Sequence, residues 1–244
     1  MLDAIGRRLT QIWPRAPWYA GRLGQTIHSD GCTFTLPNRY LAGAMRLGGY
    51  EVGERRAVRR FLPRDLPLVE LGAGLGIVSC VANKLLTNPS NHLCVDGNPL
   101  ALAGAKAHGE VNGCRFSTLH AALAYDTRTV MFGVDEHIQS GGVNSGHRTV
   151  SVPAVTLADL FARTGFARCS LICDIEGAEH AMVTREGELM QARVALLILE
   201  THPDVYGAAG ETEIDARLST LGYVRQWRRR DVTVWRNSRL IPHV

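Results

Sequence analysis

A short glycine-rich segment after an apolar run limits the folds open to this chain more than any other feature. The run Leu66–Leu71 is followed by Gly72, Gly74 and Gly76, and an apolar helical stretch begins at Ile77. Glycine tolerates positive φ angles, and its missing side chain lets a ligand approach the backbone closely. A strand, a glycine turn and a helix in this order are typical of the ligand-binding edge of an open α/β sheet.

Short apolar runs alternate with helical patterns through the rest of the chain from residue 51. Strands are expected at 92–95, 114–119, 129–134, 170–173, 194–199, 223–227 and 232–236, and helices at 51–61, 77–86, 100–111, 157–163, 178–191 and 212–220. This alternation predicts a doubly wound, Rossmann-like α/β fold with a mostly parallel sheet. The last two strands are too close for a crossover helix, so we expect a C-terminal antiparallel hairpin.

The length of 244 residues, of which 45% are hydrophobic, suits one sizeable domain with an extension. Residues 1–50 contain prolines and scattered aromatic residues but no periodic core, so we expect an N-terminal cap there and a single domain over residues 51–244. The Gly- and Ser-rich loop Asp135–His147 is expected to be either a mobile surface connection or a lid over the substrate.

Charge and hydropathy exclude several classes of partner. The chain has 27 basic and 23 acidic residues, a net charge of +4, which is too mildly basic to predict a nucleic-acid partner. No run approaches the ~18 apolar residues of a membrane span, and the N-terminal segment lacks the apolar core of a secretory signal. The six cysteines form no zinc-binding pattern, so we expect a cytoplasmic protein without disulfides. A homo-oligomer is compatible with the sequence.

Four arginines, Arg55, Arg56, Arg59 and Arg60, give the expected helix over 51–61 a basic face. Such a face is ordinarily solvated. The alternative is that it meets a phosphate group on a nucleotide-sugar or carrier-linked substrate, because the guanidinium group suits phosphate.

Two acids near the glycine turn indicate the class of cofactor. The dinucleotide-binding motif G-x-G-x-x-G requires its third glycine one position after Gly76, where this chain has Ile77. Glu70 precedes the loop and suits a cofactor whose amino-acid portion carries a positive charge, which describes S-adenosylmethionine. Asp96 ends the next strand, where its carboxylate can accept both hydroxyls of a ribose. The sequence therefore favours S-adenosylmethionine over a nicotinamide dinucleotide.

Three acids, Asp174, Glu176 and Glu179, follow a strand that is expected to be buried and open the next helix. Carboxylates at a helix N-terminus are stabilised by the macrodipole, by ~0.3–1 kcal/mol each, which explains one of them without function. Three acids around Gly177 at the carboxyl end of a strand favour a catalytic role for Asp174 and Glu176.

General acid–base chemistry at this edge of the sheet needs a side chain that takes up a proton. Four candidates, His180, His202, Glu176 and Glu200, stand near the expected site, and we prefer His202 because it follows the most apolar strand. Alternatively, a divalent cation held by Asp174, Glu176 and Glu200 could lower the pKa of a substrate group.

Several segments together resemble the FkbM family of S-adenosylmethionine-dependent methyltransferases. They are 50–54, 69–76, 96–99, 120–123, 152–160, 173–179 and 199–202. The most specific is Cys173–Glu179, which is similar to the family motif K-x-D-x-E-G-x-E. Gly97, in contrast, stands where the family usually has Pro.

The resemblance implies a Rossmann-like methyltransferase fold with a cofactor site. The implied cofactor-binding residues are Glu70, Gly72, Gly74, Gly76, Asp96, Asn98 and Ala121. It also implies methyl transfer to a hydroxyl of a sugar, glycoside or polyketide-type small molecule, with Asp174, Glu176 and His202 as catalytic residues.

Two other functions compete with an O-methyltransferase. An NAD-dependent oxidoreductase could share the fold, but the chain lacks the third glycine and a convincing catalytic Tyr-Lys or His pair. A binding module without catalysis could also keep the fold. The presence of Glu70, Asp96 and Asp174 beside the glycine loop weighs against this second alternative.

Overall fold

The computed structural model describes residues 16–134 and 148–240. The loop Asp135–His147, expected to be a surface connection or a lid, lies outside these residues, as does the first part of the expected cap.

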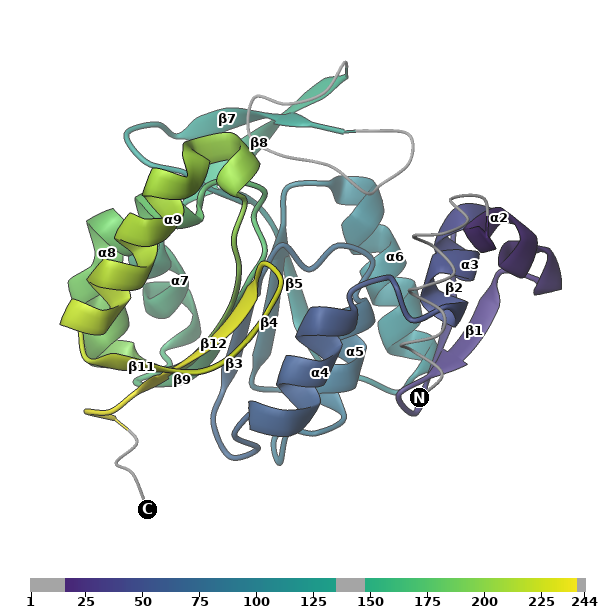
Figure 1. Cartoon of the computed structure of the whole chain (residues 1–244), viewed down its shortest axis with the longest axis horizontal. Helices are drawn as coiled ribbons and strands as arrows, with labels where there is room; N and C mark the ends of the chain where they lie inside the picture. The colour runs from purple at the N-terminus through teal and green to yellow at the C-terminus, as the bar shows by residue number, and fades with distance from the viewer. Residues whose placement is uncertain (1–15, 135–147, 241–244) are drawn as a thin grey trace.

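A seven-stranded sheet forms the centre of the molecule (Figure 1). Its order is β11 (Tyr223–Arg229), β12 (Val232–Asn237), β10 (Val194–Glu200), β9 (Cys169–Cys173), β3 (Leu68–Leu71), β4 (His92–Asp96) and β5 (Ser117–His120). The strands from β10 to β5 pair in parallel, whereas β12 pairs antiparallel with both β10 and β11. The predicted fold class is confirmed, including the C-terminal hairpin at the sheet edge.

Helices cover both faces of this sheet, as a doubly wound fold requires. One side holds α4 (Val52–Phe61), α5 (Ile77–Asn83) and α6 (Pro99–Val111), and the other holds α7 (Leu157–Thr164), α8 (Glu179–Arg193) and α9 (Pro203–Thr220) (Figure 1). Side chains alternate along each strand, so Leu68 and Leu196 join the core under α4 and α5, while Val69 and Leu197 join the core under α7 to α9.

Two expected helices differ from the structure by three residues or more at one end. The expected helix over 77–86 ends at Asn83. The expected helix over 212–220 is the second part of α9, which begins at Pro203 and is interrupted by Gly207 at φ 76°. The first part was missed because this glycine breaks the helical pattern of the sequence.

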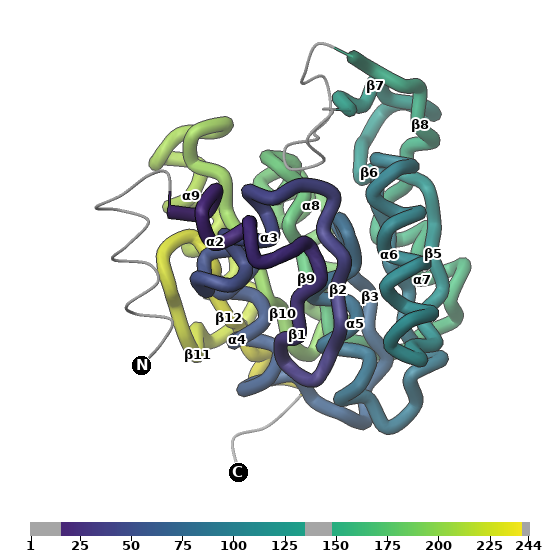
Figure 2. The backbone as a smooth tube through the Cα atoms, turned by 90° about the vertical axis from the view of Figure 1, so that its right-hand side faces the viewer, coloured from purple at the N-terminus to yellow at the C-terminus, as the bar shows by residue number. Residues whose placement is uncertain are grey.

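Residues 16–50 are more regular than the sequence suggested. They form α2 (Ala16–Ala20), the 3-10 turn η1 (Gly21–Leu23), the hairpin of β1 (Thr26–Ser29) and β2 (Cys32–Thr35), and α3 (Arg39–Arg46). Phe34 and Leu41 are fully buried in the core under α4 and α5. The strand β2 lies beside α6 (Figure 2). Its Thr33 and Thr35 N–H groups donate hydrogen bonds to the side chains of Asn112, which follows α6, and of His108 within α6. A boundary at residue 50 therefore stays a prediction.

The arginine face of α4 is only partly solvated. The Arg55 side chain is 7% exposed and forms an ion pair with Asp30 in the β1–β2 turn, and the exposed Arg59 pairs with the same carboxylate. The expectation of a fully solvated face is wrong for Arg55, because the folded N-terminal segment supplies a buried anion that sequence spacing does not reveal.

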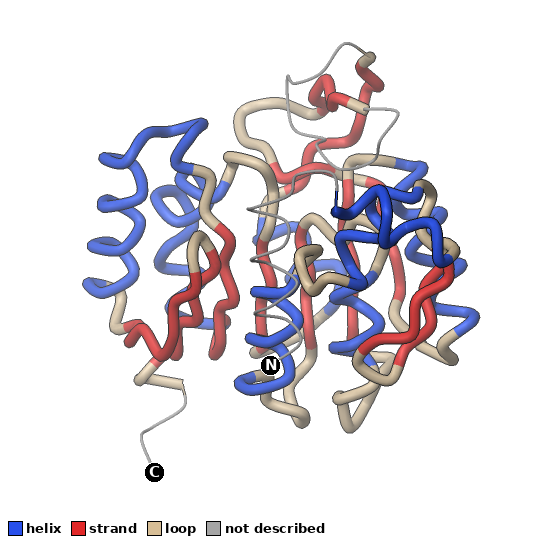
Figure 3. Tube along the Cα trace, turned by 45° about the vertical axis from the view of Figure 1, so that its right-hand side comes forward, coloured by secondary structure: helices blue, strands red, loops and turns tan. Residues whose placement is uncertain are grey.

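A small second sheet stands beyond the end of the central one (Figure 3). It contains β6 (Ala122–Leu123), β8 (Thr149–Val155) and β7 (Thr129–Gly133) in that order. The strand β8 was not expected, since Pro153 interrupts its sequence. Within the described ranges, no helix has the length and apolar character needed to cross a membrane.

Candidate functional site

A cavity of about 490 Å³ opens at the carboxyl ends of the central strands. In an open α/β sheet this edge is where ligands bind. The titratable and charged side chains in its lining are Glu51, Glu54, Asp96, Asp174, Glu176, Glu200, His202, Arg229, Arg230 and Asp231, besides Tyr40 and Tyr50. The cavity is thus strongly acidic, with its arginines confined to the β11–β12 turn.

The predicted glycine loop joins β3 to α5 and owes its shape to close packing. Gly72 has φ +79°, and a Cβ there would lie 1.6 Å from the carbonyl oxygen of Asp174. Gly74 has φ +52°, and both glycines line the cavity. Gly76, at φ +75°, precedes α5, where a Cβ would lie 2.8 Å from the Cα of Ala105. It does not line the cavity, so its role is packing.

Asp96 lies beside this loop at the end of β4. Its Oδ2 accepts a hydrogen bond from the Gly74 N–H at 2.7 Å, and its Oδ1 accepts one from the Asn98 N–H at 2.7 Å. Burial raises the pKa of Asp96, and these two donors oppose that rise. The carboxylate is therefore rigidly held in the cavity wall, and each oxygen keeps acceptor capacity for a ligand.

Asn98 and Ala121, also expected in the cofactor site, both line the cavity. The Oδ1 of Asn98 caps α6 by accepting hydrogen bonds from the N–H groups of Leu100 and Ala101 at 3.0 and 3.3 Å. The Ala121 N–H donates to the Asp96 carbonyl at 3.1 Å. The capping accounts for Asn98 by itself, so cofactor contact by either residue stays a prediction.

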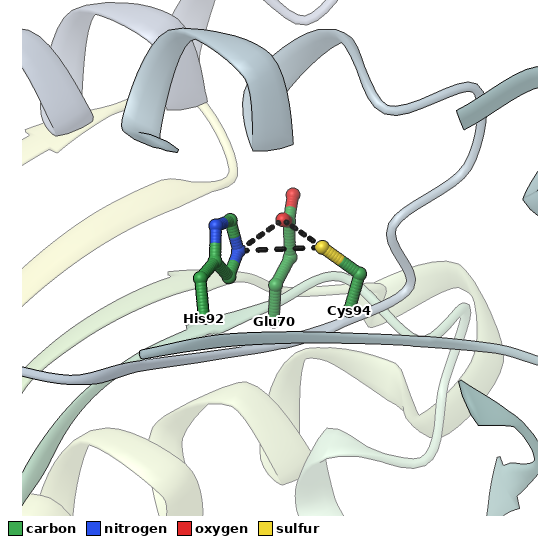
Figure 4. Close-up of side chains that lie close together, drawn as sticks. All are labelled: Glu70, His92 and Cys94. Atoms are coloured by element: carbon green, nitrogen blue, oxygen red, sulfur yellow. Dashed lines mark hydrogen bonds and ion pairs between the residues drawn. The ribbon is translucent and has the colours of Figure 1, made fainter. Parts of the chain in front are cut away.

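Glu70 does not line the cavity. It is 1% exposed, and its Oε2 lies 3.1 Å from His92 Nε2 and 3.5 Å from Cys94 Sγ (Figure 4). Side-chain alternation along β3 turns it to the face that packs under α5. Its position does not support the expected contact with the positive charge of a cofactor.

Glu70, His92 and Cys94 are close enough to hold a metal ion, but their surroundings favour a hydrogen-bonded network. Asn83 Oδ1 accepts from the Arg115 N–H, so its Nδ2 faces Pro89 and His92 Nδ1. His92 thus contacts the Asn83 amide through Nδ1 at 3.3 Å and Glu70 through Nε2 at 3.1 Å. Burial raises the pKa of the Cys94 thiol.

The acidic turn between β9 and α8 is organised by Glu179, which is fully buried. Its Oε1 accepts hydrogen bonds from the N–H groups of Ile175 and Gly177 at 3.0 and 3.2 Å. Glu176 takes the left-handed conformation, at φ +54°, within this turn. The helix macrodipole predicts an acid at this helix start, but no sequence pattern indicates that Glu179 also reaches His202.

His202 follows β10 and contacts three carboxylates. Its Nδ1 lies 3.0 Å from Glu179 Oε1, and its Nε2 lies 3.5 Å from both Asp174 Oδ1 and Glu176 Oε2. Burial lowers the pKa of His202, but the acids outweigh it and raise that pKa to about 9. Burial and Glu54 raise the pKa of Asp174 to about 8. The structure thus brings together the three residues expected to be catalytic.

A second acidic group lies beside the first. Oxygens of Glu54, Asp174 and Glu200 come within 4.8 Å of one another. Burial, together with the neighbouring Glu54, raises the pKa of Glu200 to about 11. The three expected metal ligands, Asp174, Glu176 and Glu200, thus fall into two groups that share Asp174. Glu176 belongs to the group with His202, and Glu200 belongs to the group with Glu54. A divalent cation stays a prediction.

Backbone strain is concentrated around the cavity. Among the described residues, five that are not glycine have positive φ, and three of these, Glu51, Glu176 and Arg230, line the cavity. Left-handed conformations are costly for long side chains and persist where the surrounding structure enforces them, which occurs often at functional sites.

Fold and cavity define a Rossmann-like α/β protein with a ligand site at the carboxyl edge of its sheet. No protein-family model and no curated protein matches the chain. Among solved structures, it is similar to Aeropyrum pernix fibrillarin in complex with S-adenosyl-L-methionine, with 10% identity over 76% of this chain and 73% of that chain and a TM-score of 0.44.

Two further solved structures are methylases or were solved with the same ligand. The ribosomal protein L11 methylase from Lactobacillus delbrueckii subsp. bulgaricus has 13% identity, covers 75% of each chain and has a TM-score of 0.43. M. jannaschii TYW2 in complex with AdoMet has 13% identity over 86% of this chain and 82% of that chain, with a TM-score of 0.43. These similarities concern the fold, and none points to the FkbM family in particular.

Proposed function

We propose that this protein is an S-adenosylmethionine-dependent methyltransferase that acts on a hydroxyl group of a sugar, glycoside or polyketide-type small molecule. The observation that carries the proposal is the pairing of Asp96 with Gly74 at one wall of the cavity. It presents a fixed carboxylate beside an open backbone turn, which suits a ribose and the chain attached to it.

The charge of the cavity supports this cofactor over a nicotinamide dinucleotide. S-adenosylmethionine carries a sulfonium and an ammonium group, and acids such as Glu51, Asp174 and Glu176 line the cavity together with Asp96. A positive charge beside these acids lowers their raised pKa values and favours their ionised forms, whereas the negative charge of a pyrophosphate would raise those pKa values further. The acidic lining therefore favours a cationic cofactor.

Bound S-adenosylmethionine would supply an electrophilic methyl group at this site. We assign His202 to the acceptor proton, with Nε2 as the receiving atom, because Glu179 occupies Nδ1. With its pKa raised to about 9, the imidazole is protonated in the ligand-free site at neutral pH. A sulfonium charge nearby disfavours that proton and prepares Nε2 to accept one. Asp174 and Glu176 then hold the imidazolium.

Two features support a hydroxyl group as the methyl acceptor. One is the resemblance of segments such as Cys173–Glu179 to the FkbM family, and the other is the position of His202 in the cavity, where its imidazole can take up a proton. Residues of the N-terminal segment, including Tyr40 and Tyr50, contribute to the cavity lining. We assign these two tyrosines to the acceptor side of the cavity.

Calorimetry and product analysis test the two parts separately. Titration of the full chain with S-adenosylhomocysteine should give saturable binding, and titration with NAD should not. Saturable NAD binding without S-adenosylhomocysteine binding would overturn the cofactor assignment. Incubation with methyl-labelled S-adenosylmethionine and candidate hydroxylated acceptors, followed by mass spectrometry, should place the label on oxygen. Label found only on nitrogen or carbon would contradict O-methylation.

A further inference from the structure

We propose that Arg229 and Arg230, at the tip of the β11–β12 hairpin, form a subsite for a phosphate group carried by the acceptor. This inference rests on the proposed function, because it assigns the group to the methyl acceptor. Both arginines line the same cavity as Asp174 and His202.

A bulge in β11 decides which arginines face the cavity. Arg225 and Arg228 point to α9, where they form ion pairs with Asp215 and Glu211. Residues on one face of a regular strand are an even number of positions apart, whereas Arg225 and Arg228 are an odd number apart. The strand must therefore be irregular between them, and the pairing of β11 with β12 shifts register between Arg225 and Trp227. After this shift, side chains alternate regularly again.

The shifted alternation places Trp227 and Arg229 on the α4 side of the sheet. Trp227 contacts Phe61 of α4, with ring centroids 6.2 Å apart. Arg229, two residues later, shares this side and enters the cavity wall. Without the bulge, Arg229 would share the side of Arg225 and face α9.

Among the described residues, no partner holds the guanidinium group of either cavity arginine, whereas the neighbouring arginines are paired. Arg228 Nη2 lies 2.8 Å from Glu211 Oε1, and Arg225 is bound to Asp215. No ion pair or hydrogen bond to another described residue involves the guanidinium group of Arg229 or Arg230. The hairpin therefore uses two arginines for its own stability and leaves two for a ligand.

The tip that carries these arginines is fixed rather than loose. Arg230 has φ +54°, a strained conformation for a long side chain. The next carbonyl, that of Asp231, accepts hydrogen bonds from the N–H and the hydroxyl of Thr201 at 3.0 and 3.2 Å. Thr201 directly precedes His202, so the arginine tip is anchored beside the proposed base.

Guanidinium groups bind phosphate through paired hydrogen bonds, and two adjacent arginines suit a dianionic group. The arginines of α4 are less suited, since Arg55 and Arg59 already hold Asp30. The tip carries one acid, Asp231, against its two cavity-lining guanidinium groups, which leaves one positive charge in excess. Within the described lining, a phosphate carried by the acceptor would thus meet the basic part of an otherwise acidic cavity.

The binding of inorganic pyrophosphate to the full chain tests this subsite. Calorimetry at constant ionic strength, with saturating S-adenosylhomocysteine, should show one saturable site. The double variant Arg229→Gln/Arg230→Gln should weaken binding about tenfold or more, the effect of losing charge-assisted hydrogen bonds. The matched variant Arg225→Gln/Arg228→Gln changes the same net charge on the same hairpin and should alter affinity less than about twofold. Thermal unfolding reports whether each variant folds.

Three results would overturn the subsite, and each differs from failure of the proposed function. Equal loss in both double variants would show a non-specific charge effect. Absence of saturable pyrophosphate binding to a chain that binds S-adenosylhomocysteine would contradict the subsite alone. Weaker S-adenosylhomocysteine binding in the Arg229/Arg230 variant, with pyrophosphate binding unchanged, would show that these arginines hold the carboxylate of the cofactor. Failure to bind S-adenosylhomocysteine at all would instead reject the proposed function.

Discussion

His202 Nδ1 lies 3.0 Å from Glu179 Oε1, and this contact joins the residue before α9 to the first residue of α8. The same Glu179 oxygen accepts two backbone hydrogen bonds from the acidic turn. One fully buried carboxylate thus fixes the histidine ring and the turn that carries Glu176. Nε2 is left to face Asp174 and Glu176, in the cavity.

The first prediction concerns this positioning contact. Glu179→Gln keeps an acceptor oxygen but removes the charge, so the ring is held less firmly and the pKa of His202 falls from about 9. We expect kcat to fall ~10-fold or more, with little change in the affinity for S-adenosylhomocysteine. The measurements are steady-state kinetics and NMR titration of His202.

Glu213→Gln, at the half-exposed His180–Glu213 pair, is the control and should change neither kcat nor the pKa of His202. An unaltered kcat and histidine pKa in Glu179→Gln would leave Glu179 with a folding role only.

The second prediction concerns the cofactor. Asp96→Ala should weaken S-adenosylhomocysteine binding by one to two orders of magnitude, on the order of 1.5–3 kcal/mol for charge-assisted hydrogen bonds. The reason is that the carboxylate is fixed in the cavity wall by Gly74 and Asn98. Calorimetry measures the affinity, and Asp65→Ala, at an exposed position outside the cavity, is the control. Unchanged affinity in a folded Asp96→Ala protein would place the ribose elsewhere.

The third prediction separates chemistry from helix capping. Asp174→Asn and Glu176→Gln should leave the affinity for S-adenosylhomocysteine, which lacks the sulfonium charge, nearly intact and lower turnover by ~10²-fold or more, because both acids hold the imidazolium of His202. Wild-type turnover combined with a lower melting temperature would support capping alone.

Chelation tests the expected divalent cation in the same assay. Activity that survives EDTA means that no exchangeable metal is required, and Asp174 and Glu176 then act on protons and orientation. Activity that is lost with EDTA and restored by Mg²⁺ or Mn²⁺ would instead favour a cation near Asp174 and Glu200.

Sequence reasoning found those parts of the site that are local in the chain. The places of Asp96 and Gly74 could be predicted because Asp96 ends one strand and Gly74 lies in the turn after its parallel neighbour, and parallel order brings such strand ends together. Cofactor contact by Glu70 stays a prediction, because its distance from the glycines does not reveal which sheet face it occupies. In the structure it lies on the same face as Leu68, which packs under α4 and α5.

The residues that sequence reasoning missed enter the cavity from distant elements. Glu54 comes from α4, before the first central strand, and Arg229 comes from the last hairpin. Whether Glu54 faces the cavity depends on how α4 packs, and the direction of Arg229 depends on a bulge in β11. Neither packing angle nor bulge leaves a periodic signal in the sequence.

The fourth prediction concerns pH-dependent stability. Burial opposes the charge of Asp30, yet Arg55 and other donors lower its pKa below the usual value. A lowered folded-state pKa means that this carboxylate stabilises the fold above about pH 4 and that the contribution is lost as pH falls further. Asp30→Asn should reduce the free energy of unfolding by about 3 kcal/mol at pH 7, because Arg55 is left buried without its anion.

Urea denaturation at pH 7 and at pH 3 checks the fourth prediction. The difference in stability between wild type and Asp30→Asn should be large at pH 7 and smaller at pH 3. Glu188→Gln, in an exposed pair with Arg217, is the control and should behave like the wild type at both values. A difference that stays constant with pH would show that Asp30 acts through its shape and not its charge.

The last prediction tests the close approach at the glycine loop. Gly72 and Gly113 both have positive φ, +79° and +66°, so alanine is strained at either position. At Gly113 a Cβ would meet nothing within 4 Å, and Gly113→Ala should cost only about 1 kcal/mol of stability. At Gly72 the Cβ would lie 1.6 Å from the Asp174 carbonyl oxygen, so β3 and β9 must separate at their carboxyl ends. Gly72→Ala should therefore destabilise the protein by clearly more than Gly113→Ala. Where the Gly72→Ala protein folds, its S-adenosylhomocysteine binding should be at least tenfold weaker, the difference that a loss of about 1.4 kcal/mol produces.

Thermal unfolding and calorimetry on both variants make the comparison. Equal stability losses in the two variants, with cofactor affinity retained in Gly72→Ala, would show that the loop tolerates a side chain and that its shape is not set by the neighbouring strand.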